Sequence, residues 1–174
     1  MLKKYLEIGK IINKRGISGE LKVMPMCDSP DSVSEIKKLY ISPDGKDERD
    51  VISVKPYRDF LYIKLRGVDS AESADMLRGK ILYACRDDIK HDKGRVFIAD
   101  LLGLEVKDAD TGKVYGKLKE VFGSGSSDIY RITDGEKEYL CPAVPGILIS
   151  AVPGKEILVR PIPGIFDDAE EIRP

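Results

Sequence analysis

Few residues of this sequence stand in a pattern that could catalyse a reaction. The single histidine, His91, lies in the charged stretch 87–94. Acid–base catalysis needs a carboxylate or a nucleophile held beside the imidazole on a rigid frame. The three cysteines, Cys27, Cys85 and Cys141, are far apart and odd in number, which fits neither a metal-ligand spacing nor a disulfide framework. We therefore expect a solvated histidine and buried, reduced thiols.

Two aspartate pairs and one flexible loop could be taken for ligand sites. Asp87-Asp88 and Asp108/Asp110 have the composition of turns and lack the spacing of an EF-hand. Gly123–Asp128 lacks the Gly-Lys-Ser/Thr ending with which a P-loop holds phosphate and Mg²⁺, and it precedes a strand instead of a helix. The sequence thus predicts a mobile hairpin loop there, and no catalytic residue, metal site or cofactor.

A basic, glycine-containing segment near the N-terminus is the best candidate for a binding site. It runs from Lys14 to Gly19 as Lys-Arg-Gly-Ile-Ser-Gly, and Lys22 follows in the next strand. Basic side chains beside glycines can contact phosphate, which gives affinity without base specificity. The glycines are also what a tight turn with positive φ requires. We expect the turn, and we take as the candidate RNA-binding residues Lys14, Arg15, Gly16, Gly19 and Lys22.

The charges divide unevenly along the chain. Residues 1–90 contain 18 basic and 15 acidic residues, whereas residues 91–174 contain 11 basic and 15 acidic residues. A net charge of −1 therefore hides a positive first half and a negative second half, which suggests two faces for two partners. The start lacks the apolar run of a signal peptide, and no stretch of about 18 apolar residues could span a membrane. We expect a soluble, cytosolic protein.

The remaining pattern is one of short strands separated by turns. Within 60–65, Leu61, Ile63 and Leu65 share one face, and Tyr62 and Lys64 share the other. Strands at this spacing favour small barrels. We expect strands over residues 5–12, 20–24, 39–41, 51–55, 60–65, 80–85, 103–107, 114–122, 129–133, 138–141 and 156–160.

One helix and one linker complete the expected organisation. The helix is predicted over Ser70–Leu77, capped by Asp69 or Ser70 and ended by Gly79. The charged stretch before residue 96 separates two strand-rich halves. We therefore expect a mostly β chain with an N-terminal domain over 1–88, a linker over 89–95, a second domain over 96–168 and a flexible tail over 169–174.

Several segments resemble one known family. Gly9-Lys10-Ile11-Ile12 and Arg15–Val23 resemble the opening of RimM, a family of bacterial ribosome maturation factors. Other segments are similar to that family in its order and spacing: Ala71–Lys80 with its Leu-Arg-Gly-Lys ending, Asp100–Val106, Gly112 to Gly116, Asp128–Tyr130, Cys141–Val144 and Pro163–Asp167. The resemblance covers residues 5–168. Each motif alone is weak, and their common order makes the resemblance specific.

The resemblance implies both a fold and a function. The fold is an N-terminal β-barrel like those of translation factors, followed by a barrel of the PRC type. The function is non-catalytic: late assembly of the small ribosomal subunit, in support of 16S rRNA processing. The implied partners are 16S rRNA in the 30S head and a head ribosomal protein, the nineteenth of the small-subunit series. No membrane partner is implied, and we expect a monomer.

One departure from the family lies at the domain junction. Family members often carry two aromatic residues, commonly tyrosines, just before the Asp-Leu that opens the second domain. Here these positions are Val96 and Phe97, so one ring remains and no hydroxyl. Because aromatic and arginine side chains dominate protein interfaces, we take Arg95, Val96 and Phe97 as the candidate site for the ribosomal protein. Packing of Phe97 between the two domains is the alternative.

Two other functions stay open at this stage. One is a PRC-barrel scaffold that binds a protein or a small ligand independently of the ribosome, against which the basic N-terminal segment argues. The other is a nuclease acting on precursor rRNA, which would need a cluster of His, Asp and Glu with metal or acid–base spacing. No such cluster is visible in the sequence.

Overall fold

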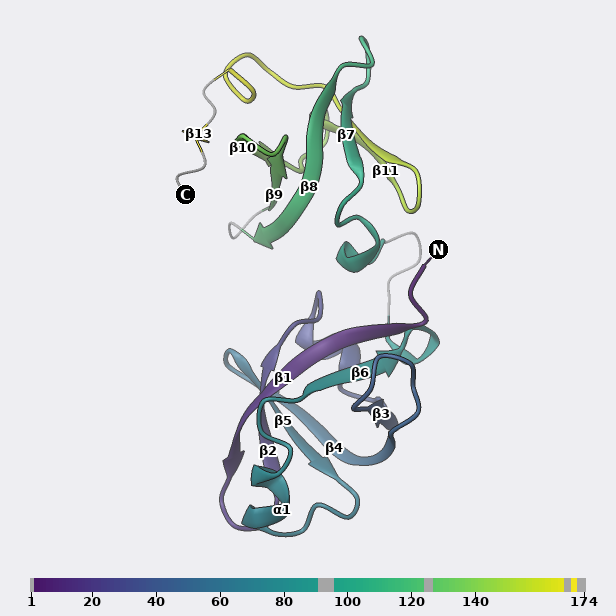
Figure 1. Cartoon of the computed structure of the whole chain (residues 1–174), viewed down its shortest axis with the longest axis vertical. Helices are drawn as coiled ribbons and strands as arrows, with labels where there is room; N and C mark the ends of the chain where they lie inside the picture. The colour runs from purple at the N-terminus through teal and green to yellow at the C-terminus, as the bar shows by residue number, and fades with distance from the viewer. Residues whose placement is uncertain (1, 91–95, 124–126, 168–169, 172–174) are drawn as a thin grey trace. The chain divides into compact units, whose positions relative to one another are not determined.

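Six strands of the N-terminal half close into a barrel (Figure 1). The computed structural model describes residues 2–90, 96–123, 127–167 and 170–171. Around the barrel the strands follow the order β1-β2-β5-β4-β3-β6, and neighbouring strands are antiparallel. Their bounds are β1 Tyr5–Arg15, β2 Glu20–Pro25, β3 Lys38–Tyr40, β4 Glu48–Tyr57, β5 Phe60–Leu65 and β6 Ile81–Cys85.

Alternation of apolar and polar residues explains why these strands surround one core. Leu61, Ile63 and Leu65 of β5 are fully buried, and the residues between them face outward. Leu21 and Val23 continue the buried row on β2. Successive side chains of a strand point to opposite faces, so the inward row fills the barrel while the outward row forms its surface.

The described residues contain one α-helix, α1 (Ala71–Asp75), which packs against β1 and β2. The Ser70 hydroxyl accepts a hydrogen bond from the Ser73 N–H at 3.1 Å, and the Ser73 hydroxyl accepts one from the Ser70 N–H. The helix ends before the predicted Leu77 because the Leu77 N–H bonds to the Ala74 carbonyl, three residues earlier, and tightens the last turn. Three 3-10 turns are η1 Pro30–Val33, η2 Arg86–Asp88 and η3 Ile98–Asp100.

A seven-stranded sheet builds the second half (Figure 1). The chain divides into two compact units, residues 3–95 and, with the first two residues, residues 96–174. In the second unit the strand order is β11-β12-β7-β8-β9-β10-β13, with β12 and β7 parallel. The bounds are β7 Glu105–Asp108, β8 Val114–Gly123, β9 Asp128–Thr133, β10 Lys137–Pro142, β11 Leu148–Val152, β12 Glu156–Val159 and β13 Glu170–Glu171. The prediction of a mostly β chain with two barrel-like domains is confirmed.

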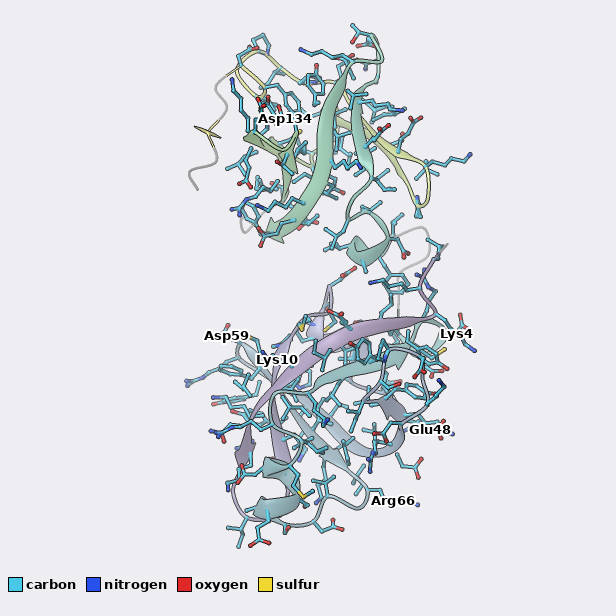
Figure 2. All side chains as sticks on the ribbon, viewed as in Figure 1. Lys4, Lys10, Glu48, Asp59, Arg66 and Asp134 are labelled. Atoms are coloured by element: carbon cyan, nitrogen blue, oxygen red, sulfur yellow. The ribbon has the colours of Figure 1, made fainter. Side chains whose placement is uncertain are left out.

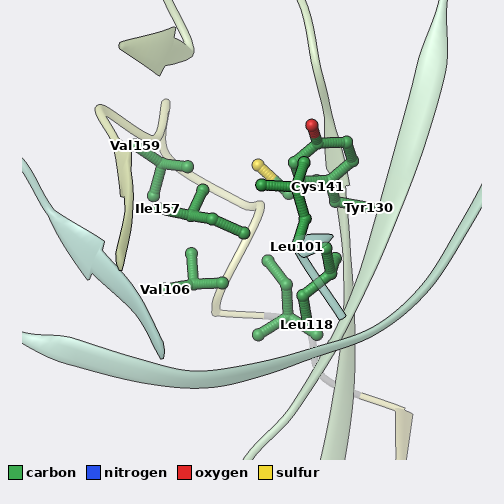
Figure 3. Packing of buried hydrophobic residues seen from close by; sticks show 8 residues of the cluster. Leu101, Val106, Leu118, Tyr130, Cys141, Ile157 and Val159 are labelled. Carbon is green, nitrogen blue, oxygen red and sulfur yellow. The ribbon is translucent and has the colours of Figure 1, made fainter. Parts of the chain in front are cut away.

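The core of the second unit draws on most of its strands. Figure 3 shows side chains of this core converging on a common interior: Leu101, Val106, Leu118, Tyr130, Cys141, Ile157 and Val159. Ile132 of β9 belongs to the same cluster. Phe166 packs against this core and stacks on Tyr115, with ring centroids 3.8 Å apart and planes 7° from parallel. Its ring also lies 5.2 Å from that of Tyr139. The segment after β12 is thus fastened to the sheet by an aromatic cluster.

Two sequence expectations need correction. The sequence predicts no strand over β11, because Leu-Ile-Ser-Ala-Val does not alternate in polarity. Buried thiols are predicted at all three cysteines, but only Cys141 is buried. Cys85 is half-buried because it takes an outward position on β6, and Cys27 lies just beyond the end of β2. Within the expected tail, Glu170–Glu171 pairs with β10, and the flexibility of the tail stays a prediction.

Replacing Phe166 tests the aromatic cluster. Phe166→Ala is expected to lower the free energy of unfolding by about 2 kcal/mol, because the ring loses its packing and two aromatic partners. Ile162→Ala is the control: that side chain is 59% exposed and its removal should cost less than about 0.5 kcal/mol. Urea unfolding followed by circular dichroism measures both. Equal effects of the two substitutions would contradict the assignment.

The turn after β7 predicts a strongly acidic carboxyl group. Asp108 accepts hydrogen bonds from the N–H groups of Thr111 and Asp110, at 2.9 and 2.8 Å, and from the Tyr115 hydroxyl at 2.8 Å. The Thr111 N–H, then the Tyr115 hydroxyl, favour the carboxylate and lower the pKa of Asp108 from 3.8 to about 2. This stabilisation is complete above pH about 4 and is lost as the pH falls through about 2. An NMR titration should find that midpoint, and a midpoint near 3.8 would contradict these hydrogen bonds.

Candidate nucleic-acid interface

The turn between β1 and β2 contains the glycines of the basic segment. Gly16 and Gly19 have positive φ angles of 65° and 79°, which favour glycine at both positions. A Cβ at Gly19 would also collide with the carbonyl of Val68, whereas nothing lies within 4 Å of a Cβ at Gly16. The predicted turn is therefore present, and Gly19 additionally permits two chain segments to approach closely.

Lys64 of β5 fastens this turn to the segment that precedes α1. Its ammonium group donates hydrogen bonds to the carbonyls of Ser18 and Val68 and lies 3.0 Å from the Asp69 carboxylate. The side chain is only 19% exposed. Since an ammonium group has three donors, these partners use all of them. Lys64 therefore holds the turn in place and has no donor left for a ligand.

Lys14 is engaged within the protein. Its ammonium group forms an ion pair with Asp75 of α1. Nearby, Arg78 donates to the side-chain oxygen of Asn13 at 2.9 Å and to the carbonyl of Ile12 at 3.2 Å. Both members of the Lys14–Asp75 pair are partly exposed, and such pairs stabilise a protein by about 0–1 kcal/mol. Lys14 can exchange its partner for a phosphate, at the cost of this pair.

Arg15 and Lys22 lie over aromatic rings. The Cζ atom of Arg15 is 4.3 Å from the ring centroid of Tyr62, and the Nζ atom of Lys22 is 3.9 Å from that of Phe60. The ring quadrupole attracts a cation at such distances. Arg15 also lies 3.6 Å from the Glu20 carboxylate. Two of the predicted basic residues thus meet on one aromatic surface.

This surface is the outward side of β2, β5 and β4. Lys22 of β2 pairs in register with Tyr62 of β5, which pairs on its other side with Lys55 of β4. Two residues further along β4, Tyr57 pairs with Phe60 of β5. The ring centroids of Tyr57 and Tyr62 are 6.3 Å apart. We call this surface the aromatic face; its residues are Tyr57, Phe60, Tyr62, Arg15, Lys22, Lys55 and Arg58.

Positive charge predominates on the aromatic face. Within the part of the chain that the structure describes, no carboxylate forms an ion pair with Lys22, Lys55 or Arg58. Two carboxylates border the face: Glu20, and Asp59, which Figure 2 shows at the outer edge of the barrel. Aromatic rings and cations together on an outer protein surface are a combination that can bind unpaired bases and phosphates.

Sequence reasoning missed the three rings of this face. The alternation over 60–65 places Tyr62 on the outer side of its strand, and that signal was available. The pairing of Tyr62 with Lys22 was not, because it depends on the register between strands that lie far apart in the sequence.

The second predicted site is only partly described. Arg95 lies outside the described residues. Val96 is half-buried and packs against the core of the second unit. Phe97 is half-buried and immediately precedes η3, where its carbonyl accepts a hydrogen bond from the Asp100 N–H at 2.9 Å. Val96 thus packs against the domain core, and the roles of both Val96 and Phe97 in binding stay predictions.

The remaining cysteine and acidic residues that the structure describes form no metal-binding cluster. His91 and residues 124–126 of the predicted loop lie outside the described residues. In the described ranges, no three His, Cys, Asp or Glu side chains meet where they could hold a metal ion. Asp110 is paired with Arg160 through two contacts of 2.7 Å, and Asp108 completes the turn after β7. No helix of the described chain is long and apolar enough to cross a bilayer.

Comparison with known proteins assigns the family. The RimM N-terminal domain model matches residues 6–89. The ribosome maturation factor RimM of Acetivibrio thermocellus is 34% identical over 170 residues, covering 94% of this chain and 97% of that protein. The chain belongs to the RimM family of ribosome maturation factors. The RimM of Ruminiclostridium cellulolyticum is 36% identical over 168 residues, covering 94% and 98% of the two chains.

Two solved RimM structures are similar to this chain at lower identity. The crystal structure of RimM from Pseudomonas aeruginosa is 23% identical and gives a TM-score of 0.44, covering 89% of this chain and 96% of that one. The solution structure of the N-terminal domain of RimM from Thermus thermophilus is 22% identical, with a TM-score of 0.43 over 51% of this chain and 96% of that one. The family resemblance inferred from the sequence motifs is confirmed by the two sequence relatives, each of which matches 94% of this chain.

The two glycines of the β1–β2 turn should differ in their tolerance to substitution. Gly16→Ala is expected to lower the free energy of unfolding by about 1 kcal/mol, the cost of positive φ for a residue with a Cβ. Gly19→Ala should cost at least about 2 kcal/mol, because the methyl group also collides with the Val68 carbonyl. Thermal unfolding of the two variants measures the difference. Equal costs would mean that the turn can move away from Val68.

Proposed function

We propose that this chain is a non-catalytic assembly factor for the small ribosomal subunit, which binds the 30S head and thereby promotes late maturation and 16S rRNA processing. The observation that carries the proposal is the basic surface of the N-terminal barrel, in a chain whose relatives are named ribosome maturation factors. Arg15 and Lys22 stand on a rigid barrel beside a turn that Lys64 holds in place. Such a surface suits the phosphates of rRNA.

The second unit would bind a protein neighbour. Residues 91–174 carry more acidic than basic residues, and a negative domain is complementary to a basic ribosomal protein. We assign this contact to the nineteenth protein of the small-subunit series, with Phe97 and the adjoining Arg95 and Val96 as contact residues. Val96 would act by positioning Phe97, because its own side chain packs into the domain core.

Two modest contacts on one chain would act together. Once one domain is bound, the other binds at a high effective concentration, so the combined affinity exceeds that of either contact alone. Release follows when the matured 30S head no longer presents both surfaces together. Binding, and not bond-making chemistry, is then sufficient for the role, and the site of action is the cytoplasm, where ribosomes are assembled.

The scaffold alternative is less well supported. Lys22, Lys55 and Arg58 of the first barrel form no ion pair with the carboxylates that the structure describes, and a PRC-barrel protein that acts independently of the ribosome would not need these cations. A nuclease has even less support, since the described residues bring no metal-binding group together.

Charge neutralisation on the first barrel tests the proposal. Arg15→Gln combined with Lys22→Gln is expected to weaken association with immature 30S subunits about tenfold, because two phosphate contacts are lost. Lys38→Gln combined with Lys46→Gln is the matched control, since it removes the same charge from ion pairs with Glu48 and Asp44 elsewhere on the same unit. Co-sedimentation with purified subunits measures the association.

Three results would contradict the proposal. The first is equal association of the unmodified chain with immature 30S, mature 30S and 70S particles. The second is an equal loss for the two double variants, which would make the effect one of net charge alone. The third is specific cleavage of precursor 16S rRNA by the purified chain with Mg²⁺, which would make it an enzyme.

A further inference from the structure

We propose that the aromatic face of the N-terminal barrel is a stacking surface for unpaired bases of RNA, with its basic side chains contacting the flanking phosphates. The inference rests on the proposed function and names what the barrel would recognise: a single-stranded segment, in preference to a duplex. The rings, the cations above them and the backbone of one turn each support it.

The three rings stand on the solvent side of the barrel wall. Phe60 and Tyr62 alternate with the fully buried Leu61 and Ile63, so the pleat of β5 holds both rings outside the core. Tyr57 is 55% exposed, and its ring plane is tilted by 49° from that of Tyr62. Phe60 and Tyr62 are half-buried. Every base has a π face, so neighbouring rings that reach solvent can stack bases with little sequence preference.

Each ring of the aromatic face carries a cation. The distances to the ring centroids are 3.9 Å for Lys22 over Phe60, 4.3 Å for Arg15 over Tyr62 and 5.4 Å for Arg58 over Tyr57. A guanidinium plane above a ring is itself a surface on which a base can stack, and an ammonium group at the same level can contact the next phosphate. Each ring of the face therefore has a positive charge next to it, so a base that stacks here lies close to a cation that can contact its phosphate.

The turn between β4 and β5 adds a backbone observation. Arg58 has φ +53°, and it is the only non-glycine residue with positive φ among those the structure describes. The first position of such a two-residue hairpin loop favours Gly, Asn or Asp, so an arginine here costs conformational energy. Strain of this kind concentrates at functional sites. The same backbone conformation places the Arg58 guanidinium group over the ring of Tyr57, at the edge of the aromatic face.

Single-stranded RNA fits this face better than the other anionic polymers. A duplex presents phosphates and 2′-hydroxyl groups but keeps its bases stacked inside, so the rings would have no partner. An acidic peptide would pair with the cations and likewise leave the rings unused. A strand with exposed bases uses both the rings and the charges.

Binding by the full-length chain tests the inference. The probes are a non-self-complementary RNA strand of about 12 nucleotides, the blunt duplex of the same sequence, and a polyaspartate peptide of similar length. Because the chain contains eight tyrosines and no tryptophan, stacking can be followed as quenching of tyrosine fluorescence. We expect the single strand to bind most tightly and to quench this emission.

Substitutions separate stacking from charge. Phe60→Leu with Tyr62→Leu should weaken binding of the single strand at least about tenfold at every salt concentration. Tyr83→Leu, on the half-buried outer side of β6, is the control and should bind as the unmodified chain does. Arg15→Gln and Lys22→Gln should instead each reduce the slope of log affinity against log salt by about 0.7.

Arg58→Gly adds a readout that a purely structural role would not produce. Glycine relieves the positive φ, so the variant should unfold at a higher temperature and yet bind the single strand more weakly. A variant that gains stability and keeps its full affinity would remove Arg58 from the surface.

The inference is overturned if the ring variant binds the single strand as tightly as the unmodified chain does. It is also overturned if the duplex or the polyaspartate peptide binds at least as tightly as the single strand. Sedimentation with 30S subunits separates this failure from that of the proposed function. A chain that sediments with subunits but fails the oligonucleotide test keeps its assembly role and loses the stacking surface.

Discussion

The alternation of β5 is the constraint on which both the core and the outer surface of the first barrel depend. Leu61, Ile63 and Leu65 fill the interior completely, and the period of two leaves Tyr62 and Lys64 no other direction than outward. Lys64 then donates a hydrogen bond to the Ser18 carbonyl in the β1–β2 turn. Tyr62 lies between its strand neighbours Lys22 on β2 and Lys55 on β4. A shift of one residue in register would place the rings in the core and the leucines in water.

Local patterns in the sequence predicted the glycine turn and the outward positions of β5. They did not predict the contacts of the candidate site between segments that lie far apart in the chain. Positive φ at Gly16 and the alternation over 60–65 follow from residue type and spacing alone. The contact of Gly19 with Val68 and the position of Lys22 over Phe60 join segments about 40 or more residues apart, and strand register sets such contacts. The strand β11 was missed for a local reason, because its residues do not alternate in polarity.

The second unit shows how family motifs can have a structural role. Pro163–Asp167 belongs to the motifs by which the chain resembles its relatives, and within it Phe166 stacks on Tyr115 while Gly164 donates to Asp167 at 3.1 Å. Tyr115 in turn donates to Asp108, whose carboxylate also organises the turn after β7. One hydrogen-bonded aromatic cluster therefore connects the segment after β12 to β8 and to the turn after β7. This motif stabilises the domain, which leaves surface positions to determine the partner.

Preorganisation determines which basic residues can contribute most to binding. Arg15 and Lys22 are already positioned over rings, and the turn beside them is fastened by Lys64. Ordering these side chains is part of folding, so an incoming RNA need not supply that free energy. Lys14 differs from Lys22, since a phosphate must first replace Asp75 as its partner, and the gain is reduced by the strength of that pair. Arg15 has a weaker contact of this kind, at 3.6 Å from Glu20. The aromatic face, more than the tip of the basic turn, should therefore supply most of the affinity of this barrel for RNA.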